Sequence, residues 1–351
     1  MVYLEGILGV ANERRASDVH ITVGVPPKMR VNGTLLSMDF PILTPNDTEA
    51  IARDIMNDKQ WQKFMELGEY DMSLTVPEFG RYRVNVYKQR GSVALALRLV
   101  GMQIPTPEQL CIPQSVVDLY QKKRGLILVT GPTGSGKSTT LAALINKINE
   151  ERDAHIITLE DPIEYMHKHK MSMVNQREIG VDSGDYAAAL RAALREDPDV
   201  ILVGEMRDLE TISIAVRAAE TGHLVLSTLH TIGAASTVDR VIDVFPPHQQ
   251  QQIRVQLATV LEAIISQQLI ATADGLGRVA AFEVLHATYS VRNLIRENKS
   301  FQLTSVMQTG KGIGMCTMDD ALLQLYFEGR ITRENALLYA QNIETMQQKL
   351  Y

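Results

Sequence analysis

The amino-acid sequence predicts an α/β protein with a mostly parallel sheet, preceded by a smaller α+β domain. Two patterns after about residue 115 support the parallel sheet. Strands and helices alternate there, and a glycine-rich phosphate-binding motif follows the first strand. A stretch spaced by prolines, "GMQIPTPEQLCIPQ" (101–114), separates the two halves and predicts a linker. We therefore expect an N-terminal domain over 1–100, a linker over 101–114, and a larger domain over 115–351 that becomes helical from about 285.

The composition excludes several classes of protein. A chain of 351 residues is long enough for two domains of roughly 150 residues each. The net charge of −6 argues against a broad nucleic-acid-binding face, which needs clustered Lys and Arg. Cys111 and Cys316 form no CxxC pair, so we expect neither a zinc site nor a disulfide framework, which fits a reducing compartment. No apolar run reaches the roughly 18 residues of a spanning helix, so we expect no transmembrane segment.

Alternating apolar residues predict three strands in the N-terminal domain: "DVHITV" (18–23), "RYRVNVYKQ" (81–89) and "VALALRL" (93–99). Between them, Thr44 as N-cap and Pro45 at the first helical position predict the start of a helix. Arg83 and Arg98 project from the faces opposite the apolar ones. From the residues alone, a solvated sheet face is the simplest explanation of these two arginines.

The larger domain reads as a series of buried strands and amphipathic helices. We expect strands over 125–130, 155–160, 200–203 and 223–228. We expect helices from about 137 and over 185–196, 208–220 and 249–270. This alternation implies helices on both faces of the sheet, and the chain reads as mostly helical beyond about residue 233.

The segment "GPTGSGKS" (131–138) matches G-x-x-x-x-G-K-[ST] between a strand and a helix, which is the context that this nucleotide-binding motif requires. Its glycines allow backbone angles and close approaches that a Cβ would block, so the loop amides can surround an anion at a helix N-terminus. Lys137 supplies a charge for the outer phosphates, and Ser138 offers a hydroxyl to Mg²⁺. An ordinary glycine-rich turn would not explain both the motif and its context. The expected nucleotide-binding residues are Gly131, Thr133, Gly134, Ser135, Gly136, Lys137, Ser138 and Thr139.

Acidic residues and a histidine follow three of the predicted strands. Glu160, Asp161 and Glu164 follow one strand, Glu205 follows Gly204 at the end of another, and His230 follows a third. Ligands of parallel α/β sheets bind at the carboxyl ends of strands, so these side chains are candidates for handling metal and water. The residues alone do not rank Glu164 above Glu160. Acids in such places also cap helices, as Asp208 is expected to do, and a single histidine is often structural.

Four motifs in this order resemble those of the secretion-type motor ATPases, most specifically the type IV pilus retraction ATPases. They are "GPTGSGKSTT" for Walker A, "TLEDPIEY" for the aspartate box, "DPDVILVGEMRD" for an atypical Walker B and "TGHLVLSTLHT" for the histidine box. The resemblance implies a RecA-like P-loop ATPase core that uses ATP and Mg²⁺. It implies that Glu205 takes the Walker B role at Mg²⁺ together with Ser138. It further implies that Glu164 is the general base, and that His223 and His230 are the box histidines, with His230 nearer the phosphates.

The resemblance also covers the N-terminal domain, which would be PAS-like and would supply Arg83 and Arg98 to the phosphates. It implies a homohexamer that drives pilus retraction through an inner-membrane platform protein, with a paralogous retraction ATPase as a further partner. The expected place is the cytoplasm, peripheral to the inner face of the membrane, without direct contact to nucleic acid. "SVRNLIRE" (290–297) resembles the signature helix of retraction ATPases, although Ser290 and Val291 depart from its usual Ala-Ile start.

Two other functions fit part of the pattern. A nucleic-acid motor could share the same core, but the acidic charge and the lack of a basic or aromatic-rich stretch argue against it. A non-catalytic, nucleotide-gated subunit would have lost a catalytic position. Lys137, Ser138, Glu164, Glu205 and His230 are all present, which favours an active hydrolase.

Overall fold

The computed structural model describes residues 4–31, 33–77, 79–100 and 104–350. The chain divides into two compact units, Met1–Gln103 and Ile104–Tyr351, each of which is described by itself. The first three residues of the expected linker, 101–103, lie outside the described residues. The remainder of that stretch, up to Pro113, leads into the first helix of the second unit.

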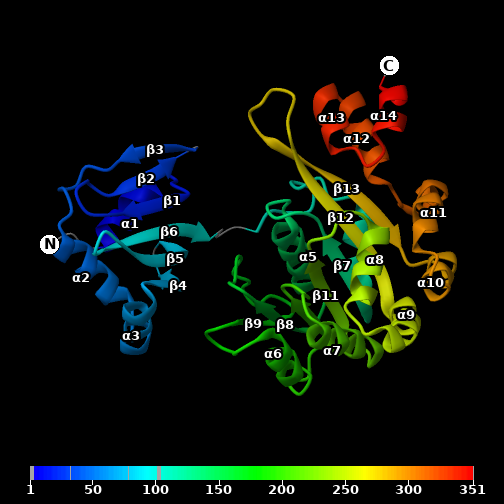
Figure 1. Ribbon diagram of the computed structural model, residues 1–351, viewed down its shortest axis with the longest axis horizontal. Coiled ribbons are helices and arrows are strands. Elements are labelled where there is room, and N and C mark those ends of the chain that lie inside the picture. The colour runs from blue at the N-terminus through cyan, green and yellow to red at the C-terminus, as the bar shows by residue number, and fades with distance from the viewer. Residues whose placement is uncertain (1–3, 32, 78, 101–103, 351) are drawn as a thin grey trace. The chain divides into compact units, whose positions relative to one another are not determined.

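The first unit is an antiparallel sheet covered by helices (Figure 1). Its elements are α1 (Leu4–Glu13), β1 (Asp18–Ile21), β2 (Lys28–Val31), β3 (Thr34–Ser37), α2 (Pro45–Ile55), α3 (Asp58–Leu67), β4 (Glu69–Val76), β5 (Gly80–Gln89) and β6 (Ser92–Val100). The strand order is β3-β2-β1-β6-β5-β4, and every neighbouring pair is antiparallel.

The local signals in the first unit act as the sequence predicts. Thr44 caps α2 in a capping box with Asp47, and Pro45 occupies the first helical turn. Along β5, Tyr82 and Val84 are buried and Arg83 between them is exposed. The apolar faces of β5 and β6 therefore pack into the core of this unit, and the arginine faces outward.

The second unit contains a seven-stranded sheet in the order β13-β12-β7-β11-β10-β8-β9. Its strands are β7 (Gly125–Thr130), β8 (His155–Glu160), β9 (Met173–Glu178), β10 (Val200–Val203), β11 (Leu224–Leu229), β12 (Leu261–Ala271) and β13 (Arg278–His286). Its α-helices are α4 (Gln114–Val117), α5 (Lys137–Glu151), α6 (Tyr186–Ala193), α7 (Leu209–Glu220), α8 (Ala234–Asp243), α9 (Pro247–Val260), α10 (Tyr289–Arg296), α11 (Leu303–Thr309), α12 (Met318–Phe327), α13 (Arg333–Tyr339) and α14 (Ile343–Lys349). All neighbouring strands are parallel except β12 and β13.

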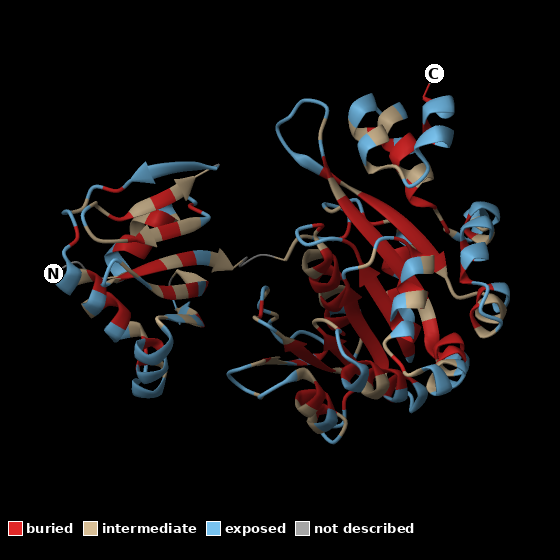
Figure 2. Ribbon diagram, viewed as in Figure 1, coloured by how far each residue is buried: buried red, intermediate tan, exposed pale blue. Residues whose placement is uncertain are grey.

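Helices cover both faces of this sheet, as the alternation predicts. In β7, Leu126 and Leu128 pack on the side of α6 to α10, whereas Ile127 and Val129 pack on the side of α4 and α5. All six residues of β7 are buried, and the buried strands form a continuous band through the unit (Figure 2). A strand buried on both faces shows no polar alternation, which explains its uninterrupted apolar sequence.

The prediction of one long helix over 249–270 is wrong. Helix α9 ends at Val260, and the next residue, Leu261, takes an extended conformation and begins β12. Strand β12 pairs with β7 and β13, and most of it is buried. Because a buried strand is apolar throughout, the apolar pattern of α9 continues into β12 and the sequence shows no boundary between them. The chain is therefore not mostly helical until α10 begins at Tyr289. No helix of the described part of the chain is long and apolar enough to cross a membrane.

Candidate functional site

The phosphate-binding loop joins β7 to α5 and is shaped by its glycines. Gly131, Gly134 and Gly136 have φ angles of 141°, 78° and 91°, which side-chain-bearing residues rarely adopt. A Cβ at Gly131 would lie 2.2 Å from the carbonyl oxygen of Gln267, and one at Gly136 would lie 2.8 Å from Gln267 Nε2. The loop therefore rests directly on β12, which leaves no room for a larger residue at either position.

The N-terminus of α5 is open to an anion. Gly136 is its N-cap and provides no side chain to bond the amides of the first turn. Those amides have no intrahelical acceptor, and with the helix dipole they favour a negatively charged ligand. The hydroxyl of Ser135 is buried in the loop without a hydrogen-bond partner among the described residues. A bound phosphate would satisfy these donors, so the residues of the loop fit a nucleotide.

Lys137 is the first residue of α5 and is almost fully buried. Its Nζ donates to the carbonyl oxygens of Gly131 at 2.8 Å and Pro132 at 3.0 Å. Burial lowers the pKa of the ammonium, and the charges of Glu164 and Glu205 oppose that shift. The two acids that follow β8 and β10 thus both lie within electrostatic range of the loop lysine.

Strand β10 ends in Gly204 and Glu205, close to the end of β8. A Cβ on Gly204 would lie 2.8 Å from the hydroxyl of Tyr186 and 3.1 Å from the carbonyl oxygen of Leu159. Glu205 Oε2 is 2.8 Å from Arg207 Nε and 3.4 Å from His230 Nε2. The structure therefore brings together Glu205 and His230, which the sequence places at separate strand ends, and adds Arg207.

Glu160 and Glu164 have different surroundings. Glu160 Oε1 accepts from Thr158 Oγ1 at 2.6 Å and from Gln176 Nε2 at 3.1 Å. Burial raises the pKa of Glu160, while these hydrogen bonds oppose the rise. Glu164 is exposed, and its carboxylate has no hydrogen bond or ion pair among the described residues. Glu160 is thus tied into the protein, whereas Glu164 is free to meet a water molecule.

The phenol of Tyr186, in α6, lies within electrostatic range of the acids that follow β8 and β10. Burial raises the pKa of its phenol, and the charges of Glu205, Asp161 and Glu160 raise it further. The phenol therefore remains protonated at neutral pH and can donate a hydrogen bond. The sequence offered no sign of this residue, because a tyrosine on a helix is usually part of the core.

His223 lies away from this group. It precedes β11, and its carbonyl oxygen accepts from the amide of Gly125, the first residue of β7. Its Nδ1 lies 2.9 Å from the carbonyl oxygen of Ala218. Within one chain, His223 therefore sits at the opposite end of the sheet from the phosphate loop, as its position before the strand predicts.

The arginines of the first unit lie side by side. Arg83 of β5 and Arg98 of β6 are directly opposite each other in the antiparallel pairing, and both are exposed. Arg98 Nε donates to Asp18 Oδ1 at 2.8 Å, with 74% of the arginine side chain exposed. Both side chains therefore face outward from the sheet, and the contact with phosphates that the resemblance implies stays a prediction.

Comparisons with known proteins show the family of this chain. The family described as "Type II/IV secretion system protein" matches residues 89–275. The type IV pilus retraction ATPase PilT of Pseudomonas aeruginosa is 48% identical over 94% of this chain and 96% of its own length. A twitching motility protein of Neisseria gonorrhoeae is 49% identical over 95% of this chain and 90% of its own.

A solved structure is similar over nearly the whole chain. The crystal structure of the pilus retraction motor PilT with bound ADP superimposes with a TM-score of 0.94. The two chains are 50% identical, and the match covers 99% of this chain and 100% of the other. The phosphate loop, the acids at the strand ends and these similarities lead to one conclusion: the chain is an ATPase of the type II/IV secretion system protein family.

Proposed function

We propose that this protein is a motor ATPase that retracts a type IV pilus. The observation that carries the proposal is the similarity to pilus retraction ATPases over almost the whole chain. The similarity extends to the arginine-bearing first unit as well as to the nucleotide-binding unit.

In the proposed mechanism the phosphate loop holds the β- and γ-phosphates of ATP. The free amides at the start of α5 donate to phosphate oxygens, and Lys137 exchanges its loop carbonyl partners for the outer phosphates. Thr133, Gly134 and Thr139 complete the lining of the loop. Because the amides at the start of α5 are already held by the fold, they need little reorganisation when charge develops on the γ-phosphate.

Glu164 is the proposed general base. Its carboxylate is exposed and lies in electrostatic range of Lys137, so a water beside the γ-phosphate could give it a proton. Glu160 is less suited to that role because its carboxylate already accepts from Thr158 and Gln176. Glu160 instead supports the loop that carries Glu164.

The donors near the loop fit Mg²⁺. Ser138 offers a hydroxyl and Glu205 a carboxylate, which are the hard oxygen ligands that Mg²⁺ prefers. Both contacts of Glu205 use Oε2, so Oε1 remains available among the described residues. When bound, Mg²⁺ would neutralise charge on the phosphate oxygens. His230, whose Nε2 lies 3.4 Å from Glu205 Oε2, would donate to a phosphate.

We propose that the working form is a homohexamer in the cytoplasm, docked at the inner face of the membrane on a platform protein. Arg83 and Arg98 would meet the outer phosphates and stabilise the charge that spreads over the transferred group. A paralogous retraction ATPase is a proposed further partner, and direct nucleic-acid contact is not part of the proposal.

The test is Mg²⁺-dependent ATP hydrolysis by the purified protein, with its mass in solution measured on the same sample, with and without DNA. We expect turnover by a hexamer that is indifferent to DNA, and hyperpiliation in a strain that carries Glu205→Ala. Turnover only in the presence of DNA would contradict the proposal, as would normal pilus retraction in the Glu205→Ala strain.

A further inference from the structure

Gln176 of β9 connects three points of the segment that carries Glu164. Its Nε2 donates to the carbonyl oxygen of Tyr165 at 2.8 Å and to Glu160 Oε1 at 3.1 Å. Its Oε1 accepts from the amide of His167 at 2.8 Å. The side-chain amide thus fixes the backbone on the C-terminal side of Glu164 and links it to Glu160.

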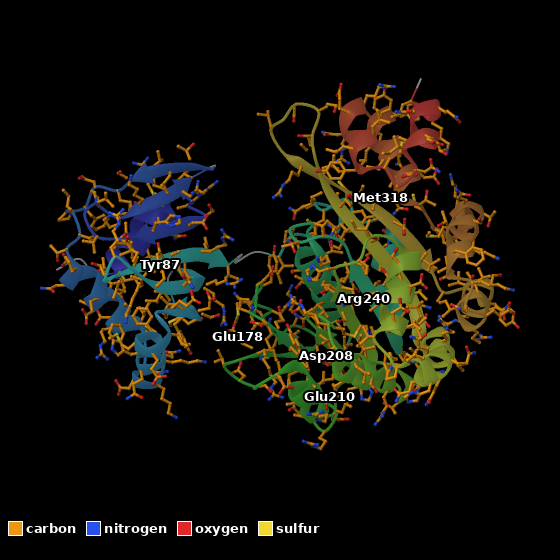
Figure 3. All side chains as sticks on the ribbon, viewed as in Figure 1. Tyr87, Glu178, Asp208, Glu210, Arg240 and Met318 are labelled. Carbon is orange, nitrogen blue, oxygen red and sulfur yellow. The ribbon has the colours of Figure 1, made fainter. Side chains whose placement is uncertain are left out.

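Glu178 secures the other side of the same segment. Its Oε2 accepts from the amide of Ile163 at 3.2 Å, and its side chain is buried. In the parallel register, Glu178 pairs with Glu160 and Gln176 with Thr158, so Gln176 and Glu178 share one face of β9. Figure 3 shows Glu178 on this strand, beside the end of β8. The backbone is therefore held at Ile163 and Tyr165, on both sides of Glu164.

Tyr165 ties this segment to the phosphate loop. Its hydroxyl lies 3.0 Å from Thr139 Oγ1, in the first turn of α5, where a phosphate would bind. The backbone amide of Glu164 bonds the Glu160 carboxylate, but the exposed Glu164 side chain has no hydrogen bond among the described residues. Its position relative to the phosphate loop therefore depends on the residues around it.

We propose that Gln176 and Tyr165 are positioning residues that hold the Glu164 carboxylate over the phosphate loop. This inference rests on the proposed role of Glu164 as general base. Gln176 sets the distance between β9 and the segment that carries Glu164, and Tyr165 sets the distance between that segment and α5. Neither residue is assigned a contact with the substrate in this proposal. Each acts through Glu164, because a base misplaced by about 1 Å loses roughly 100-fold in rate.

The first measurement is ATP turnover by the full-length protein and its Gln176→Leu, Gln176→Glu and Tyr165→Phe variants. Glutamate at 176 keeps the size and the acceptor for His167 but loses the donors to Tyr165 and Glu160. We expect kcat to fall about 10- to 100-fold for both Gln176 variants and about 3- to 10-fold for Tyr165→Phe, with KM within about threefold. The control is Gln250→Leu in α9, which removes a single hydrogen bond to the carbonyl oxygen of Phe245 and should leave kcat unchanged.

Affinities for ADP and for ADP with aluminium fluoride provide a second readout that needs no turnover. The fluoride complex places a water where Glu164 must accept a proton, so a misplaced Glu164 weakens that complex alone. We expect each variant to bind ADP as wild type does and to lose affinity for the fluoride complex by the factor lost in kcat. Equal loss for both ligands would mean general damage to the fold and would overturn the inference.

Measuring Gln176→Leu in the Glu164→Gln variant separates the positioning role of Gln176 from the proposed role of Glu164 as general base. We expect Gln176→Leu to add nothing to the loss already caused by Glu164→Gln, because both changes remove the same function. Losses that multiply would overturn the positioning role and leave the base assignment intact. Wild-type turnover and fluoride-complex affinity in Glu164→Gln alone would overturn the base assignment, and the positioning role with it.

Discussion

At the scale of single residues, the site depends on how closely the phosphate loop approaches β12. Gly131 and Gly136 meet the backbone and side chain of Gln267, and Thr140 Oγ1 donates to Gln267 Oε1 at 2.7 Å. Gln267 is buried and supports the loop from below. Nothing in the sequence marks this residue, because the apolar spacing predicts a helix where the structure has β12.

Gly136→Ala should damage nucleotide binding. The new Cβ would collide with Gln267 Nε2 in a backbone conformation that alanine avoids, so we expect ADP affinity to fall at least about tenfold, the equivalent of 1.4 kcal/mol. Calorimetric titration with ADP is the measurement. Gly275→Ala is the matched control, because Gly275 also has a positive φ, of 70°, but has open space around it and lies away from the loop. Equal ADP affinity in the two variants would contradict the predicted collision between the new Cβ and Gln267.

His167 should make stability depend on pH. Burial and the charge of Lys170 lower the pKa of its imidazole from 6.5 to about 4. Between those values the unfolded state binds more protons than the folded state, so stability is lost as the pH falls from 6.5 towards 4. The loss is limited to roughly 1.4 kcal/mol per unit of pKa difference. In urea unfolding at pH 7 and pH 5, His167→Gln should reduce the difference between the two values, whereas the exposed His248→Gln should not.

At the scale of elements, short-range patterns predict about half of the helices and strands in the described residues. Asp185 and Asp208 cap α6 and α7, and α5 begins at Lys137, because caps and glycines act within one turn. Strand β12 was missed because a strand buried on both faces has the same apolar spacing as the helix before it. Strand β9, with Gln176, was missed because it lies at the edge and its pattern is mostly polar.

The same limit applies to the site. The sequence identified the loop and the acids at the strand ends, since parallel strands bring their carboxyl ends to one edge. It could not rank Glu164 above Glu160, because that difference depends on which carboxylate Thr158 and Gln176 bond. The sequence also does not predict the roles of Arg207, Tyr186 and Gln267, since their contacts come from the tertiary structure.

Gly204 follows β10 and lies close to the end of β8 and to α6, so Gly204→Ala should disturb all three elements. The Cβ would meet the Tyr186 hydroxyl, so we expect a loss of roughly 1–3 kcal/mol in stability from overpacking, together with reduced turnover. Removing that hydroxyl in the double variant Gly204→Ala/Tyr186→Phe should restore part of the stability. Thermal unfolding and ATP turnover of the two variants are the measurements. A double variant no more stable than Gly204→Ala would assign the damage to the Leu159 carbonyl oxygen instead.

At the scale of the whole molecule, the proposed mechanism requires the first unit as well as the second. Arg83→Ala should slow ATP hydrolysis by about tenfold or more, because a guanidinium that neutralises the transferred phosphoryl group contributes strongly to the rate. Stability should change little, since Arg83 lies on the exposed face of β5. The measurements are ATP turnover and thermal unfolding of the same sample. A variant that unfolds, or one with wild-type turnover, would favour a merely solvated sheet face.

The position of β12 also bears on biosynthesis. Thr140 and Gln267 are 127 residues apart in the sequence, yet they bond beneath the phosphate loop. On the ribosome, the loop emerges long before the strand that supports it. A nascent chain that has been made only as far as Val260 would therefore carry the complete binding motif without its support. Such long-range pairing is slow to form, so we expect the growing chain to remain unable to retain ATP until β12 has been synthesised and inserted beside β7.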